Sequence, residues 1–176
     1  VYRKKSLAKQ GEDLGTEYVL DLLERFQLSQ YEHKNIAKYC DDNGILYMCT
    51  PWDSDSIVAL EELDVKAYKV ASADLTNLPL IENLIATQKP LILSTGMSTV
   101  DEIQITTDFL NSKNVEFALL HCNSTYPAPF HDINLNWIKK LKDIHYLIGY
   151  SGHERGIAVT LAAVGLGAKV VERHFT

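Results

Sequence analysis

The sequence has few cysteines and no excess of positive charge. Its 3 cysteines, Cys40, Cys49 and Cys122, are odd in number and widely spaced. This spacing excludes a disulfide framework and a zinc cluster, and reduced thiols are typical of a cytoplasmic protein. The net charge of -6 argues against a general nucleic-acid-binding surface, which is normally basic. We therefore expect a cytoplasmic protein that does not bind nucleic acid.

Long apolar runs and linkers are also missing. No run approaches the roughly 18 apolar residues of a membrane-spanning helix, so we expect no association with a membrane. The N-terminal residues have neither an initiator methionine nor a signal-peptide pattern, which suggests that the chain begins within a longer protein. The 176 residues contain no low-complexity stretch. We therefore expect one domain that spans residues 1–176.

Short apolar segments recur along the chain at a regular interval, and helical patterns lie between them. The segments are apolar on both faces, as strands are when both faces of their sheet are covered. Helices are expected over residues 19–26, after Ser29, and after Thr99, where Glu102 supplies an acidic first turn. The six predicted strands are residues 45–49, 67–71, 91–94, 117–121, 146–149 and 169–172.

Strict alternation of strands and helices predicts an α/β fold with a parallel sheet, because the crossovers are right-handed. A closed (β/α)8 TIM barrel needs about 250 residues. The 176 residues here therefore predict an incomplete TIM-type barrel of about six of the eight βα units.

Two histidines follow the last two predicted strands. His153 lies in Gly149-Tyr-Ser-Gly-His153, and His174 lies in Glu172-Arg-His174. The carboxyl ends of parallel strands meet at one edge of a sheet, where α/β enzymes place their chemistry. Two imidazoles on that edge suggest a divalent metal ion.

The segments at the other strand ends complete a pattern that resembles a known family. They are Lys69-Val-Ala-Ser72, Leu93-Ser-Thr-Gly-Met97, Leu120-His-Cys122 with Tyr126-Pro127, Gly149-Tyr-Ser-Gly-His153 and Glu172-Arg-His-Phe-Thr176. Together they resemble the sialic acid (N-acetylneuraminate) synthase family, transferases that condense phosphoenolpyruvate with an N-acetylated hexosamine. The family fold is a (β/α)8 barrel followed by an antifreeze-like domain. The resemblance implies strands three to eight of that barrel, without the first two strands or the C-terminal domain.

The resemblance also assigns roles to individual residues. It makes His153 and His174 ligands of Mn²⁺, with Mg²⁺ or Co²⁺ as alternatives. It implies that Lys69 binds the carboxylate or phosphate of phosphoenolpyruvate, and that Asp74, at a position often occupied by glutamate, binds sugar hydroxyls. The catalytic residues implied are Lys69, Asp74 and Tyr126. The substrate-binding residues implied are Thr50, Lys69, Ser72, Asp74, Asn123, Ser124, Tyr126 and Ser151.

Gly152 and two further histidines, His121 and His145, each need a separate interpretation. Gly152 occupies a position where many members of the family have an aspartate in a Ser-Asp-His motif, so an outer partner of His153 is expected to be missing. His121 precedes Cys122 in a strand, and neighbouring strand residues point to opposite faces. A structural role for His121 is therefore favoured over a Cys-His catalytic pair, and His145 is expected at the surface.

Several functions stay open at this point. The resemblance favours synthesis of a sialic acid by a longer parent enzyme, which uses small-molecule substrates and forms a homodimer in the family. Alternatives are the synthase of another nonulosonic acid, such as a legionaminic or spore-coat polysaccharide sugar, a metal-dependent aldolase, and a non-catalytic sugar-phosphate-binding remnant. Because the family also uses residues from its first two strands, we expect the 176-residue chain alone to lack turnover.

Overall fold

The structure is a computed structural model that describes residues 24–175. The chain divides into two compact units, Val1–Ile45 and Leu46–Thr176, and the single domain expected for residues 1–176 stays a prediction. Most of the helix predicted over residues 19–26 lies outside the described residues. In the first unit, α2 (Gln30–Asp42) begins at a capping box in which Ser29 and Glu32 satisfy each other's backbone N–H groups.

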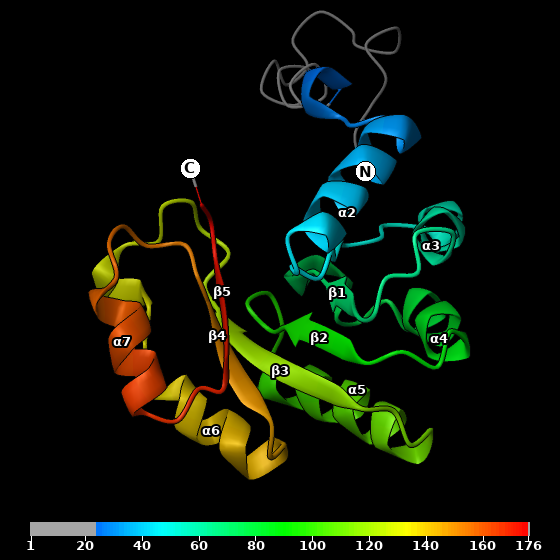
Figure 1. The fold of residues 1–176 in the computed structure, drawn as a ribbon. Helices are drawn as coiled ribbons and strands as arrows, with labels where there is room; N and C mark the ends of the chain where they lie inside the picture. Colours follow the sequence, from blue (N-terminus) through cyan, green and yellow to red (C-terminus); the bar gives the residue numbers. More distant parts are fainter. Residues whose placement is uncertain (1–23, 176) are drawn as a thin grey trace, which may run out of the picture. The chain divides into compact units, whose positions relative to one another are not determined.

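The second unit contains a parallel sheet of five strands (Figure 1). The strands are β1 (Tyr68–Val70), β2 (Leu91–Ser94), β3 (Phe117–Cys122), β4 (Ile148–Gly152) and β5 (Val170–Arg173). They lie in the sheet in chain order, and each pairs in parallel with the next. The predicted α/β fold is confirmed, because the strands curl into half of a TIM-type barrel.

The first of the six predicted strands is wrong. Residues 45–49 form no strand, and within the described part of the chain they pair with no strand of the sheet. The apolar alternation is present, since Tyr47 and Cys49 pack against the core while Leu46 is 76% exposed. A strand also requires a ladder of backbone hydrogen bonds to a neighbour, and no such ladder reaches this segment.

Helices connect the strands and cover the sheet. Helices α6 and α7 pack against β4. The predicted start at Thr99 is confirmed, because Thr99 and Glu102 form a capping box on α5. The helices of this unit are α3 (Ser54–Glu61), α4 (Leu78–Ala86), α5 (Val100–Ser112), α6 (Trp137–Ile144) and α7 (Ala158–Gly165), with short 3-10 turns η2 (Ser72–Asp74) and η3 (Phe130–Asp132).

The core lies between the sheet and these helices. All six residues of β3 are buried, as are Leu84 on α4, Leu110 on α5 and Leu141 on α6. Each such side chain contributes about 1.5–3 kcal/mol when it is removed from water. This packing holds the strands in one register and brings their carboxyl ends to a common edge.

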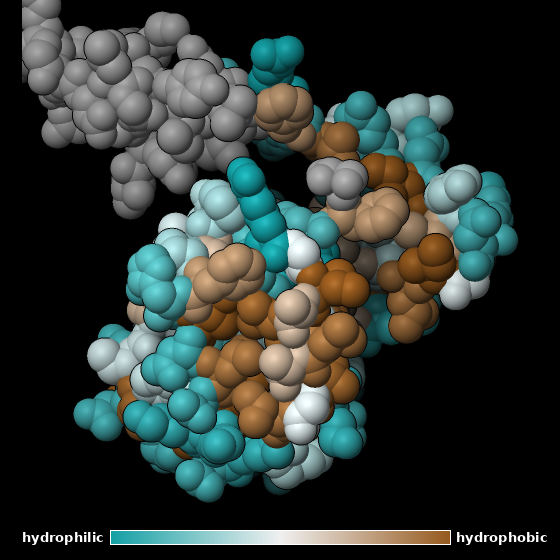
Figure 2. All heavy atoms as spheres, turned by 90° about the vertical axis from the view of Figure 1, so that its left-hand side faces the viewer, coloured by the Kyte–Doolittle hydropathy of each residue, from teal (hydrophilic) through white to brown (hydrophobic). Residues whose placement is uncertain are grey.

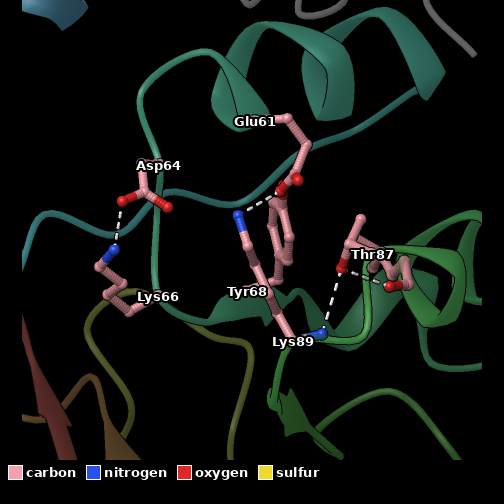
Figure 3. A network of polar contacts seen from close by, with 7 residues as sticks. Glu61, Asp64, Lys66, Tyr68, Thr87 and Lys89 are labelled. Carbon is pink, nitrogen blue, oxygen red and sulfur yellow. Dashed lines mark hydrogen bonds and ion pairs between the residues drawn. The ribbon is translucent and has the colours of Figure 1, made fainter.

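A polar network joins α3 to the starts of β1 and β2 (Figure 3). Glu61 at the end of α3 accepts hydrogen bonds from the Tyr68 hydroxyl and from Lys89 Nζ at 2.6 Å. Burial alone would raise the pKa of Glu61, but the hydrogen bonds from Lys89 and Tyr68 lower it below its ordinary value. Because Tyr68 begins β1 and Lys89 precedes β2, this network lies at the amino ends of the strands.

No helix within residues 24–175 combines the length and apolar character needed to cross a bilayer.

Candidate active site

Lys69 from β1 meets Glu172 from β5 at the carboxyl edge of the sheet. Lys69 is 8% exposed, and its Nζ lies 3.6 Å from Glu172 Oε2 and donates to the Val70 carbonyl at 2.8 Å. In a flat sheet, the first and fifth strands would lie about 19 Å apart, since strand spacing is roughly 4.8 Å. The ion pair is therefore direct evidence that the sheet curls around this site.

Burial and the ion pair shift the pKa of Lys69 in opposite directions. Burial lowers the pKa of Lys69, and the nearby Glu172 carboxylate opposes that shift. Ser151 Oγ on β4 donates to Glu172 Oε1 at 2.7 Å, so Glu172 bridges two residues predicted to bind substrate. Sequence analysis assigned no role to Glu172. The signal was available, because a carboxylate near the end of an otherwise apolar strand needs a buried partner.

The two predicted metal ligands lie together with Tyr126. The ring centroids of His153 and His174 are 5.3 Å apart. The Tyr126 ring stacks on His153 at 3.8 Å and meets His174 edge-on at 5.1 Å. The Asn123 carbonyl accepts a hydrogen bond from His153 Nδ1 at 2.6 Å. The fold therefore gathers Tyr126, both histidines and the Asn123 backbone into one cluster.

The imidazole nitrogens of this cluster are donors of a kind that binds divalent cations. Because the Asn123 carbonyl fixes the proton on Nδ1 of His153, its Nε2 keeps a lone pair for a metal. Burial lowers the pKa of His153, although the hydrogen bond to the Asn123 carbonyl partly opposes this shift. A lowered pKa favours the neutral, metal-binding form of the imidazole. No three His, Cys, Asp or Glu side chains within residues 24–175 are arranged to hold a cation. If the two imidazoles held an ion, its other coordination positions would be open to water and substrate.

Two of the predicted hydroxyl residues flank Gly96. Ser72 Oγ accepts a hydrogen bond from the Gly96 N–H at 3.1 Å. A Cβ at Gly96 would lie 2.8 Å from both Ser124 Oγ and the Cys122 carbonyl oxygen, so only glycine allows this close approach. The Gly96 N–H is engaged by Ser72, whereas each serine hydroxyl keeps a proton that it can donate to an anion.

No hydrogen bond or ion pair within residues 24–175 joins Asp74 or Thr50 to these groups. Asp74 Oδ1 accepts from Asn77 Nδ2 at 3.0 Å, whereas Oδ2 is buried and has no hydrogen-bond partner among the described residues. A buried carboxylate oxygen without a partner is costly, which makes it available to a ligand. Thr50 is half-buried, and no contact within residues 24–175 joins it or Asp74 to the histidine cluster or to Lys69.

A second ion pair joins the residue after His153 to the residue before His174. Glu154 has a fully buried side chain that forms an ion pair with Arg173 at the end of β5. Sequence analysis assigned a role to neither residue. A Cβ at Gly152 would lie 2.4 Å from Arg173 Nη1 and 2.8 Å from Glu154 Oε2. The space that a larger side chain at 152 would need is therefore occupied by this ion pair.

The other two histidines discussed above are both buried. His121 Nε2 contacts the Ile133 carbonyl at 2.6 Å, a structural contact of the kind expected. The surface position expected for His145 is wrong, because this residue is 8% exposed. Its Nε2 lies 2.8 Å from the Phe117 carbonyl, and its ring stacks on Phe117 at 3.9 Å. A short polar segment next to a strand gave no sign of that stacking.

Comparison with known proteins identifies the family. The family model described as "NeuB family" matches residues 2–176. The chain belongs to the NeuB family.

Characterised relatives of this NeuB-family chain are synthases. It is 40% identical over 161 residues to N,N'-diacetyllegionaminic acid synthase of Campylobacter jejuni, which covers 89% of the chain and 48% of the relative. It is 36% identical over 152 residues to human N-acetylneuraminate-9-phosphate synthase, which covers 85% and 42%. The chain thus spans about half the length of the curated relatives that it matches.

A solved structure shares the fold. The N-acetylneuraminic acid (sialic acid) synthetase of Leptospira borgpetersenii serovar Hardjo-bovis superposes with a TM-score of 0.88 at 33% identity. The match covers 95% of the NeuB-family chain and 58% of the solved chain. The predicted resemblance to the sialic acid synthases is therefore confirmed at the level of family and fold.

Proposed function

We propose that the polypeptide carrying this chain is a transferase that condenses phosphoenolpyruvate with an N-acetylated hexosamine, giving a sialic or other nonulosonic acid and phosphate. The observation that carries the proposal is the Lys69–Glu172–Ser151 group on the same strand edge as the His153–Tyr126–His174 cluster. Synthases of such sugars among the relatives support it. A cytoplasmic location and a homodimer stay predictions.

In this proposal, Lys69 binds the anionic groups of phosphoenolpyruvate. Its ammonium group is buried, and its ion pair with Glu172 is 3.6 Å long, so a substrate oxyanion can approach as a closer partner. The Ser72 and Ser124 hydroxyls, which flank Gly96, would supply neutral donors. Such preorganised donors stabilise negative charge that develops during reaction.

His153 and His174 would hold the divalent metal, Mn²⁺ in the first instance, with Mg²⁺ or Co²⁺ as alternatives. When bound, such an ion acts as a Lewis acid toward a carbonyl oxygen. The stacked ring of Tyr126 covers one face of His153, which limits access of water from that side. Asp74 would accept a hydrogen bond from a sugar hydroxyl through its unpartnered Oδ2, and Thr50 and Asn123 would line the substrate-binding region.

The reaction forms one carbon–carbon bond and releases phosphate. Carbon three of phosphoenolpyruvate attacks the open-chain aldehyde of the sugar, and water adds to carbon two. Cleavage of the carbon–oxygen bond at carbon two then releases inorganic phosphate. The residues of this chain contribute by positioning the two substrates and by stabilising charge.

Phosphate release tests the proposal. The natural polypeptide should release phosphate from phosphoenolpyruvate only when Mn²⁺ and an N-acetylated hexosamine are present. Lys69→Met should lower kcat/KM for phosphoenolpyruvate by about 10²-fold or more, because a buried charge that stabilises the anion is lost. The control Lys66→Met removes an exposed lysine and should leave the rate unchanged. Equal rates for both variants would refute the role of Lys69.

The acceptor sugar distinguishes two related functions. The legionaminic acid synthase relative at 40% identity favours a nonulosonic acid other than sialic acid as the second candidate. A panel that contains N-acetylmannosamine and diacetylated hexosamines should single out one substrate by its kcat/KM. Metal binding without phosphate release from any sugar would instead support the non-catalytic remnant. We also expect no release by the purified 176-residue chain, and turnover by it would refute that expectation.

A further inference from the structure

A buried ion pair connects the residue after His153 with the residue before His174. The Glu154 side chain is 0% exposed and that of Arg173 is 26% exposed. Arg173 Nη1 donates to Glu154 Oε1, and Nη2 donates to the carbonyl oxygens of Glu154 and Gly156 at 2.6 and 2.9 Å. The Tyr150 hydroxyl donates to Glu154 Oε2 at 2.7 Å. Both carboxylate oxygens are therefore already engaged, which leaves Glu154 unsuited to binding metal or moving protons.

The pair lies at the end of the β4–β5 hydrogen-bond ladder, just before the two histidines. The β4–β5 ladder ends at the pairing of Gly152 with Arg173. His153 and His174 follow those positions, so no ladder hydrogen bond joins their backbones. The Arg173 guanidinium bridges from β5 to the segment after β4 at this level. The Arg173 side chain thus connects the end of β5 to the segment that follows β4.

We propose that Arg173 and Glu154 are positioning residues that set the separation and relative orientation of the His153 and His174 imidazoles. The role of those imidazoles as metal ligands rests on the proposed function, but their geometry does not. Gly152 leaves the space that this ion pair needs, because any Cβ there would collide with Arg173 Nη1 and Glu154 Oε2.

The geometry requires arginine rather than lysine. A guanidinium presents several N–H groups in a fixed plane, so one side chain can contact a carboxylate and two carbonyls at once. A lysine keeps the charge and can pair with Glu154, but its single ammonium cannot hold Gly156 and the Glu154 carbonyl in the same arrangement. Arg173→Lys therefore separates positioning from simple charge neutralisation.

Two readouts on the natural polypeptide that carries this chain test this proposal. The first is the set of nuclear Overhauser contacts from the Tyr126 ring to each imidazole, which needs no metal. The second is Mn²⁺ affinity, followed by the electron paramagnetic resonance signal of free Mn²⁺. In Arg173→Lys we expect the Tyr126–His174 contacts to weaken while Tyr126–His153 contacts remain. We also expect the Kd for Mn²⁺ to rise by about 10–100-fold, as for other residues that orient metal ligands.

Arg155→Lys is the matched control, because Arg155 is exposed and adjacent to Glu154. It should leave both readouts as in the wild type. Unchanged contacts in a folded Arg173→Lys variant would overturn the proposal. If the wild-type chain does not bind Mn²⁺, the metal part of the proposed function fails, and the ring contacts alone decide the positioning role.

Glu154→Gln provides a second variant if Arg173→Lys does not fold. It keeps the size of the side chain and should weaken the same Tyr126–His174 contacts. Failure of both variants to fold would make the pair a requirement of the fold, which also overturns a specific positioning role.

Discussion

Gly152 has no Cβ, and the neighbouring side chains fill the space that a Cβ would need. The position where its Cβ would stand is 2.4 Å from Arg173 Nη1 and 2.6 Å from Tyr150 Cε1, closer than non-bonded atoms approach. From the family resemblance we expect an outer carboxylate partner of His153 to be missing at this position. The structure shows instead that the Glu154–Arg173 pair occupies this space.

Gly152→Ala should therefore destabilise the chain by about 1–3 kcal/mol, as expected for overpacking a buried site. Gly165→Ala is the control, since a Cβ there meets nothing within 4 Å. That change, in α7, should stabilise the chain by about 0.5–1 kcal/mol. Urea unfolding of both variants measures the difference. Equal stability of the two would contradict the contacts at Gly152.

Asp74 provides a second test on a single residue. Asp74→Asn replaces the unpartnered carboxylate oxygen with an amide of the same size. If this oxygen accepts a sugar hydroxyl, the KM for the sugar should rise about tenfold, because hydrogen bonds to charged groups are worth about 1.5–3 kcal/mol. The KM for phosphoenolpyruvate should not change. Asp55→Asn, an exposed residue on α3, is the control in the natural polypeptide, and a matching rise there would count against Asp74.

Among the elements, α3 is held to the sheet by Glu61. The hydrogen bonds from Lys89 and Tyr68 keep the pKa of Glu61 below its ordinary value despite burial. A carboxyl with a depressed folded-state pKa adds stability above its unfolded pKa, and this contribution is lost as the pH falls through the folded value.

Glu61→Gln should therefore lower the free energy of unfolding by up to about 1 kcal/mol at pH 7, because the partly exposed pair is screened by solvent. The deficit should begin to shrink below about pH 4.3, the ordinary pKa of glutamate, and should reach zero only once the pH falls below the lowered pKa of the folded state. Urea unfolding at a series of pH values from 7 downward checks this. Glu82→Gln, an exposed change on α4, should show no such pH dependence, and a constant deficit for Glu61→Gln would refute the linkage.

At the scale of the whole molecule, an apolar area lies on the face of the molecule drawn in Figure 2. Exposed apolar residues in and beside α7 and β5 are Ile157 at 72%, Leu161 at 64%, Val164 at 49% and Val171 at 43%. Contiguous exposed apolar surface of this kind is an aggregation liability in an isolated chain. Within residues 24–175, β5 pairs only with β4, and an open strand edge adds to this liability.

Leu161→Lys should therefore raise the concentration at which the 176-residue chain stays monodisperse in light scattering. Its melting temperature should hardly change, because the replaced side chain is exposed. Ala163→Lys on the same helix is the contrast, since Ala163 is 0% exposed and a charge cannot be buried there without a partner. That variant should lose cooperative unfolding. No gain in solubility for Leu161→Lys would show that the apolar area does not drive association.

The sequence by itself determined the order of strands and helices in the sheet region and the placement of chemistry at the strand ends. Those features are local: apolar runs make strands, caps such as Thr99 and Glu102 start helices, and parallel strands deliver Lys69, Ser151, His153 and His174 to one edge. The tertiary structure alone decided which side chains meet across that edge. The Lys69–Glu172 pair requires the curl of five strands, and Glu154 finds Arg173 through the β4–β5 register. The prediction of a strand at residues 45–49 was wrong for the same reason. A strand needs a neighbouring strand to pair with, and the local apolar pattern does not show whether one is present.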